Sequence, residues 1–194
     1  MIFGDILWTE GKVNPSGIKS LVYYIPKSDI LSFPTIKNED ATTIAEAVNY
    51  TGNFVLKENK HFFSLYSTQG KGSGASETFG EKDCKMFNNK VILSFPDITD
   101  EARNMMKGFV NANILLVVPL PQNRFVVIGS TDYNVETNIN ATTGDAAGSA
   151  KGLTIEVTAP DVTPFPFYKG TLQLADGVLN CATGVFTPDD DSDI

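Results

Sequence analysis

The sequence predicts a mainly β protein: an antiparallel sandwich or barrel with one flanking helix and long loops. Its apolar segments are short and rich in β-branched and aromatic residues. Gly, Asn, Asp and Pro separate them at a spacing typical of antiparallel sheets. With 194 residues, 42% of them hydrophobic, the chain is long enough for one full core. The expected strands are Ser20–Pro26, Asn53–Lys57, His61–Thr68, Lys90–Phe95, Asn113–Leu120, Arg124–Gly129, Gly152–Thr158 and Phe167–Leu174.

Two pairs of these strands are expected to form hairpins. Phe54–Tyr66 contains two apolar stretches around a polar Glu58-Asn59-Lys60 turn. Pro119–Asn123 separates two strongly apolar strands in the same way.

One helix is expected at about residues 98–111. Thr99 and its acidic neighbours supply capping oxygens and first-turn carboxylates ahead of apolar residues at helical spacing. Glu39–Val48 is a weaker candidate for a short helix.

Two long polar segments, 68–82 and 138–150, contain too little apolar material to pack alone, so both are expected to be loops. Loops of this length are functional, disordered or ordered by another subunit. The candidate assembly residues in them are Gly70, Lys71, Gly72, Ser73, Gly74, Gly144, Asp145 and Gly148.

Charge is distributed unevenly along the chain. The net charge of −8 comes from residues 125–194, which hold two basic and ten acidic side chains. This acidity disfavours a protein that grips nucleic acid through its phosphates. The final run, Thr187–Ile194, is expected to be a flexible tail. Neither a signal peptide nor a membrane span is expected.

The sequence contains few of the residues and motifs that catalysis requires, and no cofactor or metal site is expected. His61 is the single histidine, and no Gly-x-Ser-x-Gly motif surrounds the nearby serines. Gly70–Gly74 lacks the spacing of a phosphate-binding loop. Asp189–Asp193 lacks the glycine and glutamate of a calcium loop. Cys84 and Cys181 are expected to be reduced, packed thiols.

The aromatic segment Pro164–Gly170 is a candidate surface for contact between subunits. Its prolines favour an extended path that displays side chains, although ordinary core or edge packing is the alternative. The residues concerned are Phe165, Phe167 and Tyr168.

The order of elements resembles the tail tube and related neck or ring proteins of tailed bacteriophages, most closely those of phages of Bacteroides-type gut bacteria. The features that carry the resemblance are the helix followed by a hairpin at 98–129 and the Gly152-Leu153-Thr154-Ile155-Glu156-Val157 strand after a small-residue loop. It covers roughly residues 50–172. The corresponding division is an N-terminal extension with strands (1–50), a tail-tube-like β domain (51–174) and a C-terminal extension with an acidic tail (175–194). The alternative for residues 1–50 is that their strands are part of the same sandwich.

The resemblance implies a virion structural protein without enzymatic activity, assembled in the bacterial cytoplasm. Such subunits form a homo-oligomeric ring, hexameric or of higher symmetry, which contacts neighbouring tail or neck proteins. Genomic DNA passes through the channel without specific binding, and acidic walls repel its phosphates. The candidate wall residues are Asp132, Glu136, Asp145 and Glu156. A tail-completion or terminator protein forming one ring, and a non-catalytic β-sandwich binding module, are the alternatives.

Overall fold

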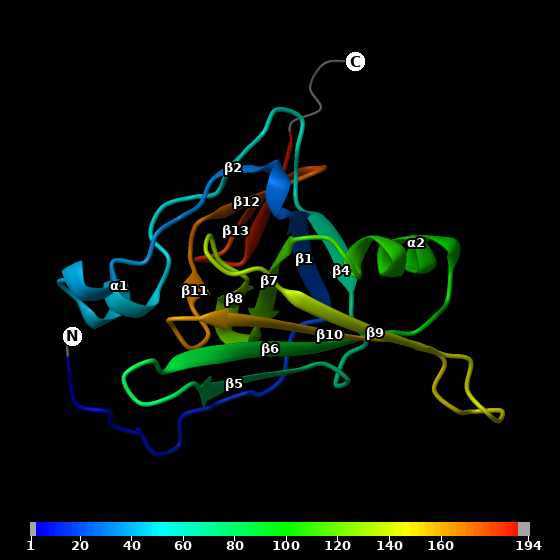
Figure 1. Ribbon diagram of the computed structural model, residues 1–194, viewed down its shortest axis with the longest axis horizontal. Coiled ribbons are helices and arrows are strands. Elements are labelled where there is room, and N and C mark those ends of the chain that lie inside the picture. The colour runs from blue at the N-terminus through cyan, green and yellow to red at the C-terminus, as the bar shows by residue number, and fades with distance from the viewer. Residues whose placement is uncertain (1–2, 190–194) are drawn as a thin grey trace.

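The computed structural model describes residues 3–189 and has two antiparallel sheets packed face to face, which confirms the expected β-sandwich (Figure 1). The strands of the two sheets cross one another in this view. The five-stranded sheet has the order β11 (Phe167–Tyr168), β8 (Arg124–Ile128), β7 (Ile114–Leu120), β1 (Leu21–Pro26) and β4 (Phe63–Tyr66). The four-stranded sheet has the order β5 (Ser73–Phe79), β6 (Met86–Phe95), β10 (Gly152–Asp161) and β9 (Glu136–Thr142).

The main core lies between these two sheets. Alternate side chains of β7, namely Ile114, Leu116 and Val118, face Leu93 of β6 and Ile155 of β10. All five are buried because the alternation of strand side chains directs one apolar set from each sheet inward.

A third layer covers the other face of the five-stranded sheet. It consists of β12 (Thr171–Leu174), β13 (Gly177–Asn180) and β14 (Val185–Pro188), with the small sheet of β2 (Ile30–Ser32) and β3 (Val55–Leu56) beside it. Leu115 and Val117 of β7 pack here with Leu172, Leu179 and Cys181. Burial on both faces explains the unbroken apolar run of β7. The three-stranded sheet continues across residue 174, the expected end of the central domain.

The expected helix is present as α2 (Asp100–Phe109), slightly shorter than residues 98–111. The Thr99 hydroxyl accepts a hydrogen bond from Ala102 N at 3.2 Å, which caps the first turn. Ala102 and Phe109 are buried against the main core. The weaker candidate, Glu39–Val48, contains a 3₁₀ turn, Asn38–Asp40, and the short helix α1 (Ile44–Val48). The other 3₁₀ turns are Lys27–Asp29 and Pro121–Asn123.

The expected hairpin at Phe54–Tyr66 is wrong, whereas the hairpin around Pro119–Asn123 is confirmed. The two strands of Phe54–Tyr66 do not pair with each other, because β3 pairs with β2 and β4 pairs with β1. In contrast, β7 and β8 pair along their lengths. Gln122 and Asn123 between them have φ of 62° and 53°, left-handed values that reverse the chain.

The two segments expected to be loops are each partly a strand. β5 (Ser73–Phe79) occupies nearly half of segment 68–82 and pairs with β6. β9 extends to Thr142 and pairs with β10, which leaves only a shorter loop before Gly152. Of the expected flexible tail, Thr187 and Pro188 belong to β14, and residues 190–194 lie outside the described residues.

Candidate assembly surface

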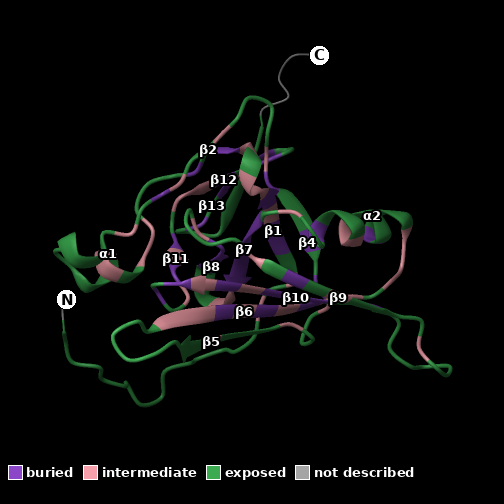
Figure 2. Cartoon of the chain, viewed as in Figure 1, coloured by how far each residue is buried: buried purple, intermediate pink, exposed green. Residues whose placement is uncertain are grey.

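The most unusual surface of the molecule is its N-terminal arm, residues 3–17, which belongs to no helix or strand (Figure 1). Ile6 is 99% exposed, Leu7 89% and Trp8 67%, although side chains of this type usually pack in a core. Phe3 and Val13 are also exposed, and Figure 2 shows the arm exposed along most of its path. Apolar side chains gathered in this way mark an interaction surface.

Few hydrogen bonds hold the arm to the rest of the chain. The Gln122 side chain donates to the carbonyl oxygen of Val13 at 2.9 Å, and Lys12 N donates to Thr9 O within the arm. Gly4 approaches Ile44 of α1 closely. These contacts leave the apolar side chains of residues 6–8 exposed.

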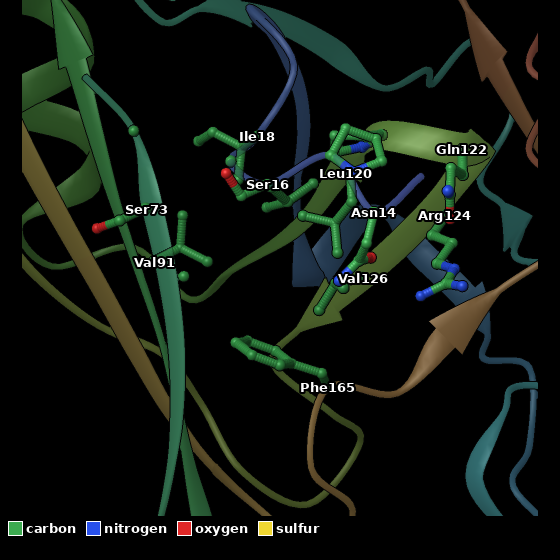
Figure 3. Close-up of a pocket in the computed structure, with 16 residues that line it drawn as sticks. Asn14, Ser16, Ile18, Ser73, Val91, Leu120, Gln122, Arg124, Val126 and Phe165 are labelled. Carbon is green, nitrogen blue, oxygen red and sulfur yellow. The ribbon is translucent and has the colours of Figure 1, made fainter. Parts of the chain in front are cut away.

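Beside the base of the arm, a groove opens between the two large sheets (Figure 3). Its volume is about 310 Å³. The buried side chains of Val91, Val118 and Val126 line it, so its floor is the main core itself. Arg124 and Gln122 stand at its edge from the β7–β8 connection. The groove therefore combines an apolar interior with a polar rim, which suits an inserted apolar side chain.

Gly72 explains how the segment that follows the arm approaches the start of β5. A Cβ at Gly72 would collide with the side chain of Ile18, so this glycine permits close packing. A Cβ at Gly74 would lie 3.4 Å from the ring of Phe165, an ordinary contact distance.

β5 is also a free edge of the four-stranded sheet, since it pairs only with β6 within the described chain. It is seven residues long and largely exposed. An exposed edge of this length presents unpaired backbone groups to which another strand can add.

The expected assembly residues separate into two places. Gly70 and Lys71 form a tight turn, Gly72 lines the groove, and Ser73 and Gly74 begin β5. Gly144, Asp145 and Gly148 lie in the projecting loop between β9 and β10, where the Ser149 hydroxyl donates to Asp145 at 2.6 Å. The sequence gives no sign of the groove, because its walls come from segments far apart along the chain.

The four expected wall acids do not converge on one surface. Glu136 and Glu156 lie on the outer face of the four-stranded sheet, since both alternate with buried neighbours. Glu156 forms an ion pair with Lys90 at 2.8 Å, which offsets its charge. Asp132 follows β8, and Asp145 is at the projecting loop.

The three expected intersubunit aromatics also differ in position. Phe165 and Phe167 are half-buried, and Phe165 lines the groove. Tyr168 is completely buried in the second core, and its hydroxyl donates to Thr171 O at 2.8 Å. The ring of Tyr168 therefore has no free surface for a neighbouring subunit.

The single histidine, the nearby Ser67 and the two cysteines lie in separate places. The His61 ring lies beside Phe63, with 4.9 Å between centroids, and the Ser67 hydroxyl accepts from Ser94 N. Burial raises the pKa of Cys181 to about 12, while Cys84 is exposed. Within residues 3–189, no three His, Cys, Asp or Glu side chains come close enough to hold a metal ion. No helix in this range is long and apolar enough to cross a bilayer.

No protein-family model matches the chain, and comparisons with curated proteins and with solved structures give no significant match.

Proposed function

We propose that the chain is a structural subunit of a homo-oligomeric ring or tube, of the kind that forms the DNA-conducting channel of a bacteriophage tail or neck. The exposed apolar arm is the observation that supports assembly. When a neighbouring molecule covers side chains such as Ile6, Leu7 and Trp8, the free energy of the assembly falls in proportion to the apolar area removed from water.

The second element of the proposal is where the arm binds. The groove between the sheets and the free edge of β5 lie next to each other on the same side of the molecule, because Ser73 and Gly74 belong to both. An arm from a neighbouring copy would add backbone hydrogen bonds to β5 and insert an apolar side chain over Val91 and Val126. Because the arm and its acceptor are different surfaces, such contacts are head-to-tail and generate rings or tubes.

The channel part of the proposal rests on the resemblance to tail tube and neck proteins. The helix-to-hairpin passage that carries it corresponds to α2, β7 and β8, and the Gly152–Val157 segment corresponds to β10. The outer face of the four-stranded sheet is the proposed wall. Glu136 supplies its negative charge there, because Glu156 is paired with Lys90.

Light-scattering mass determination followed by negative-stain electron microscopy tests this proposal on the full chain. We expect rings or tubes of hexameric or higher symmetry. Replacing Ile6, Leu7 and Trp8 together by Ser is expected to give monomers. The control replaces Leu31 and Val185 by Ser, since both are apolar side chains that are more than half exposed but lie outside the arm. A monomer at high concentration would overturn the proposal and favour the binding module. Assembly that survives the arm variant would overturn the arm contact.

A further inference from the structure

A second pocket, separate from the arm and its groove, lies where the end of β10 approaches the turn after β8. It has a volume of about 200 Å³ and is lined mostly by polar residues. Asp161, Asp132 and Tyr50 contribute to its wall, with the hydroxyl-bearing residues Thr35 and Ser130 beside them.

Asp161 contributes a buried carboxylate to this pocket. It is the last residue of β10 and is only 4% exposed. Its Oδ1 accepts a hydrogen bond from Thr163 N at 3.0 Å, whereas Oδ2 is buried and has no hydrogen-bond partner among the described residues. A buried carboxylate oxygen without a partner is costly, because ionised groups lose far more hydration energy than neutral ones.

Asp132 adds a second carboxylate to the same pocket. It is presented by a tight turn in which Ser130 N donates to Tyr133 O at 3.1 Å and Tyr133 N donates to the Ser130 hydroxyl at 3.1 Å. Burial and the charge of Asp132 raise the pKa of Asp161. Burial, Asp161 and Asp132 raise the pKa of Tyr50 in turn. The pocket is therefore a place of negative potential with oxygen atoms around it.

The charge of this pocket is not balanced by an ion pair in the described chain. The five ion pairs of the described chain involve carboxylates other than those of Asp132 and Asp161. Lys27 is a basic residue close to Asp132: burial lowers the pKa of its ammonium group, and the charge of Asp132 acts in the opposite direction. Its ammonium group is held by two uncharged oxygens, the Thr131 carbonyl at 2.8 Å and the Asn134 side chain at 2.9 Å.

We propose that this pocket binds a calcium ion through Asp161 Oδ2 and the Asp132 carboxylate, with the Tyr50 hydroxyl and water completing the oxygen shell. Ca²⁺ accepts irregular sets of oxygen ligands, whereas Mg²⁺ requires near-octahedral geometry. With two carboxylates the dissociation constant is expected on the order of 0.1 to 1 mM, the range of weak calcium modules. The ion joins the end of β10 to the turn after β8.

Terbium luminescence excited through tyrosine tests the site, because Tyr50 and Tyr133 line the pocket. We expect saturable Tb³⁺ emission from the full chain, displaced by Ca²⁺ far better than by Mg²⁺. Isothermal titration with Ca²⁺ gives the affinity directly. Because the acidic run after Pro188 is another source of carboxylates, the titrations are repeated with Asp189, Asp190, Asp191 and Asp193 replaced by Asn, and binding is expected to persist.

Two variants locate the ion, and one controls for general loss of charge. Asp161→Asn keeps the acceptor for Thr163 N, and Asp132→Asn changes an exposed residue, so circular dichroism is expected to show both folded. Each variant is expected to lower the affinity for Ca²⁺ at least about tenfold. Replacing a residue that only hydrogen-bonds to a metal ligand already causes a loss of this size. The control Asp145→Asn removes an exposed loop carboxylate and is expected to change nothing.

Three outcomes would overturn the calcium site. These are the absence of saturable Ca²⁺ binding, Ca²⁺ affinity unchanged in both pocket variants, and loss of binding when only the C-terminal acids are replaced. The oligomer measured by light scattering is an independent readout, so failure of this site leaves the arm proposal standing.

Discussion

The Asn89 side chain in β6 donates a hydrogen bond to the Thr163 carbonyl at 3.0 Å, joining residues 74 positions apart in the chain. Its Oδ1 accepts from the Ser76 hydroxyl at 2.6 Å and from Phe165 N at 3.1 Å. One buried amide thus fixes β5, β6 and the segment after β10 to one another.

Replacing Asn89 by Ala is therefore expected to cost about 2 to 3 kcal/mol in the free energy of unfolding, because buried partners lose their hydrogen bonds. Urea denaturation measures the change. Asn88→Ala, next along β6 and on its opposite face, is expected to stay within about 0.5 kcal/mol of the unmodified chain. Equal losses for the two variants would contradict the role of Asn89.

Replacing Gly152 and Gly108 by Ala is expected to change the stability of the fold in opposite directions. Gly152 has φ of 131°, and a Cβ there would collide with Phe95 O, so Gly152→Ala is expected to destabilise the fold by at least about 2 kcal/mol. Gly108 lies in α2 with open space around it, so Gly108→Ala is expected to stabilise by about 0.5 kcal/mol through higher helix propensity. Thermal unfolding of both variants measures these changes. A neutral Gly152→Ala would show that the start of β10 can shift.

The two cysteines are expected to differ in reactivity toward a disulfide reagent. Cys84 is exposed, whereas Cys181 is buried and its pKa is raised to about 12 by that burial. One thiol per chain should react under native conditions, and the second only after unfolding. Cys84→Ser should abolish the fast reaction. Fast labelling of that variant would mean that the third layer opens readily.

Asp161 is expected to make stability fall as pH rises. Burial, followed by repulsion from Asp132, raises its pKa in the folded chain above the value of 3.8 for an ordinary Asp. Between the unfolded and folded pKa values the native state binds more protons, so raising the pH through this window lowers the free energy of unfolding.

Asp161→Asn removes that penalty. In the presence of a chelator, its stability relative to the unmodified chain should increase as the pH rises above about 4, where an ordinary Asp ionises. Denaturant titrations across this range measure the difference. A difference that stays constant with pH would show that Asp161 titrates normally.

Sequence patterns predicted the individual elements better than their pairing. Thr99 and the acids after it placed α2, and the apolar runs placed β7 and β8, because these signals are local. The partners of β3 and β4 depend on contacts with β2 and β1, which a local turn pattern does not contain.

The candidate sites were harder to predict for a related reason. Gly72 favours a flexible loop when considered alone, yet a larger residue at this position would collide with the side chain of Ile18. No sequence motif singles out Asp161, because its unpartnered oxygen arises only from tertiary burial. The exposure of Trp8 is equally hard to predict, since it depends on which side chains the rest of the chain covers.

The place of β1 in the five-stranded sheet bears on how the chain folds during synthesis. β1 lies between β4 and β7, with Tyr23 opposite both Ser64 and Val117, so it leaves the ribosome long before its second partner exists. The face of that sheet that packs against the third layer stays uncovered until β12 and β13 have also been synthesised. Such dependence on distant partners slows folding to about milliseconds or longer. Until then the apolar strands are open to misassociation, so a nascent chain is expected to need a chaperone more than its modest size suggests.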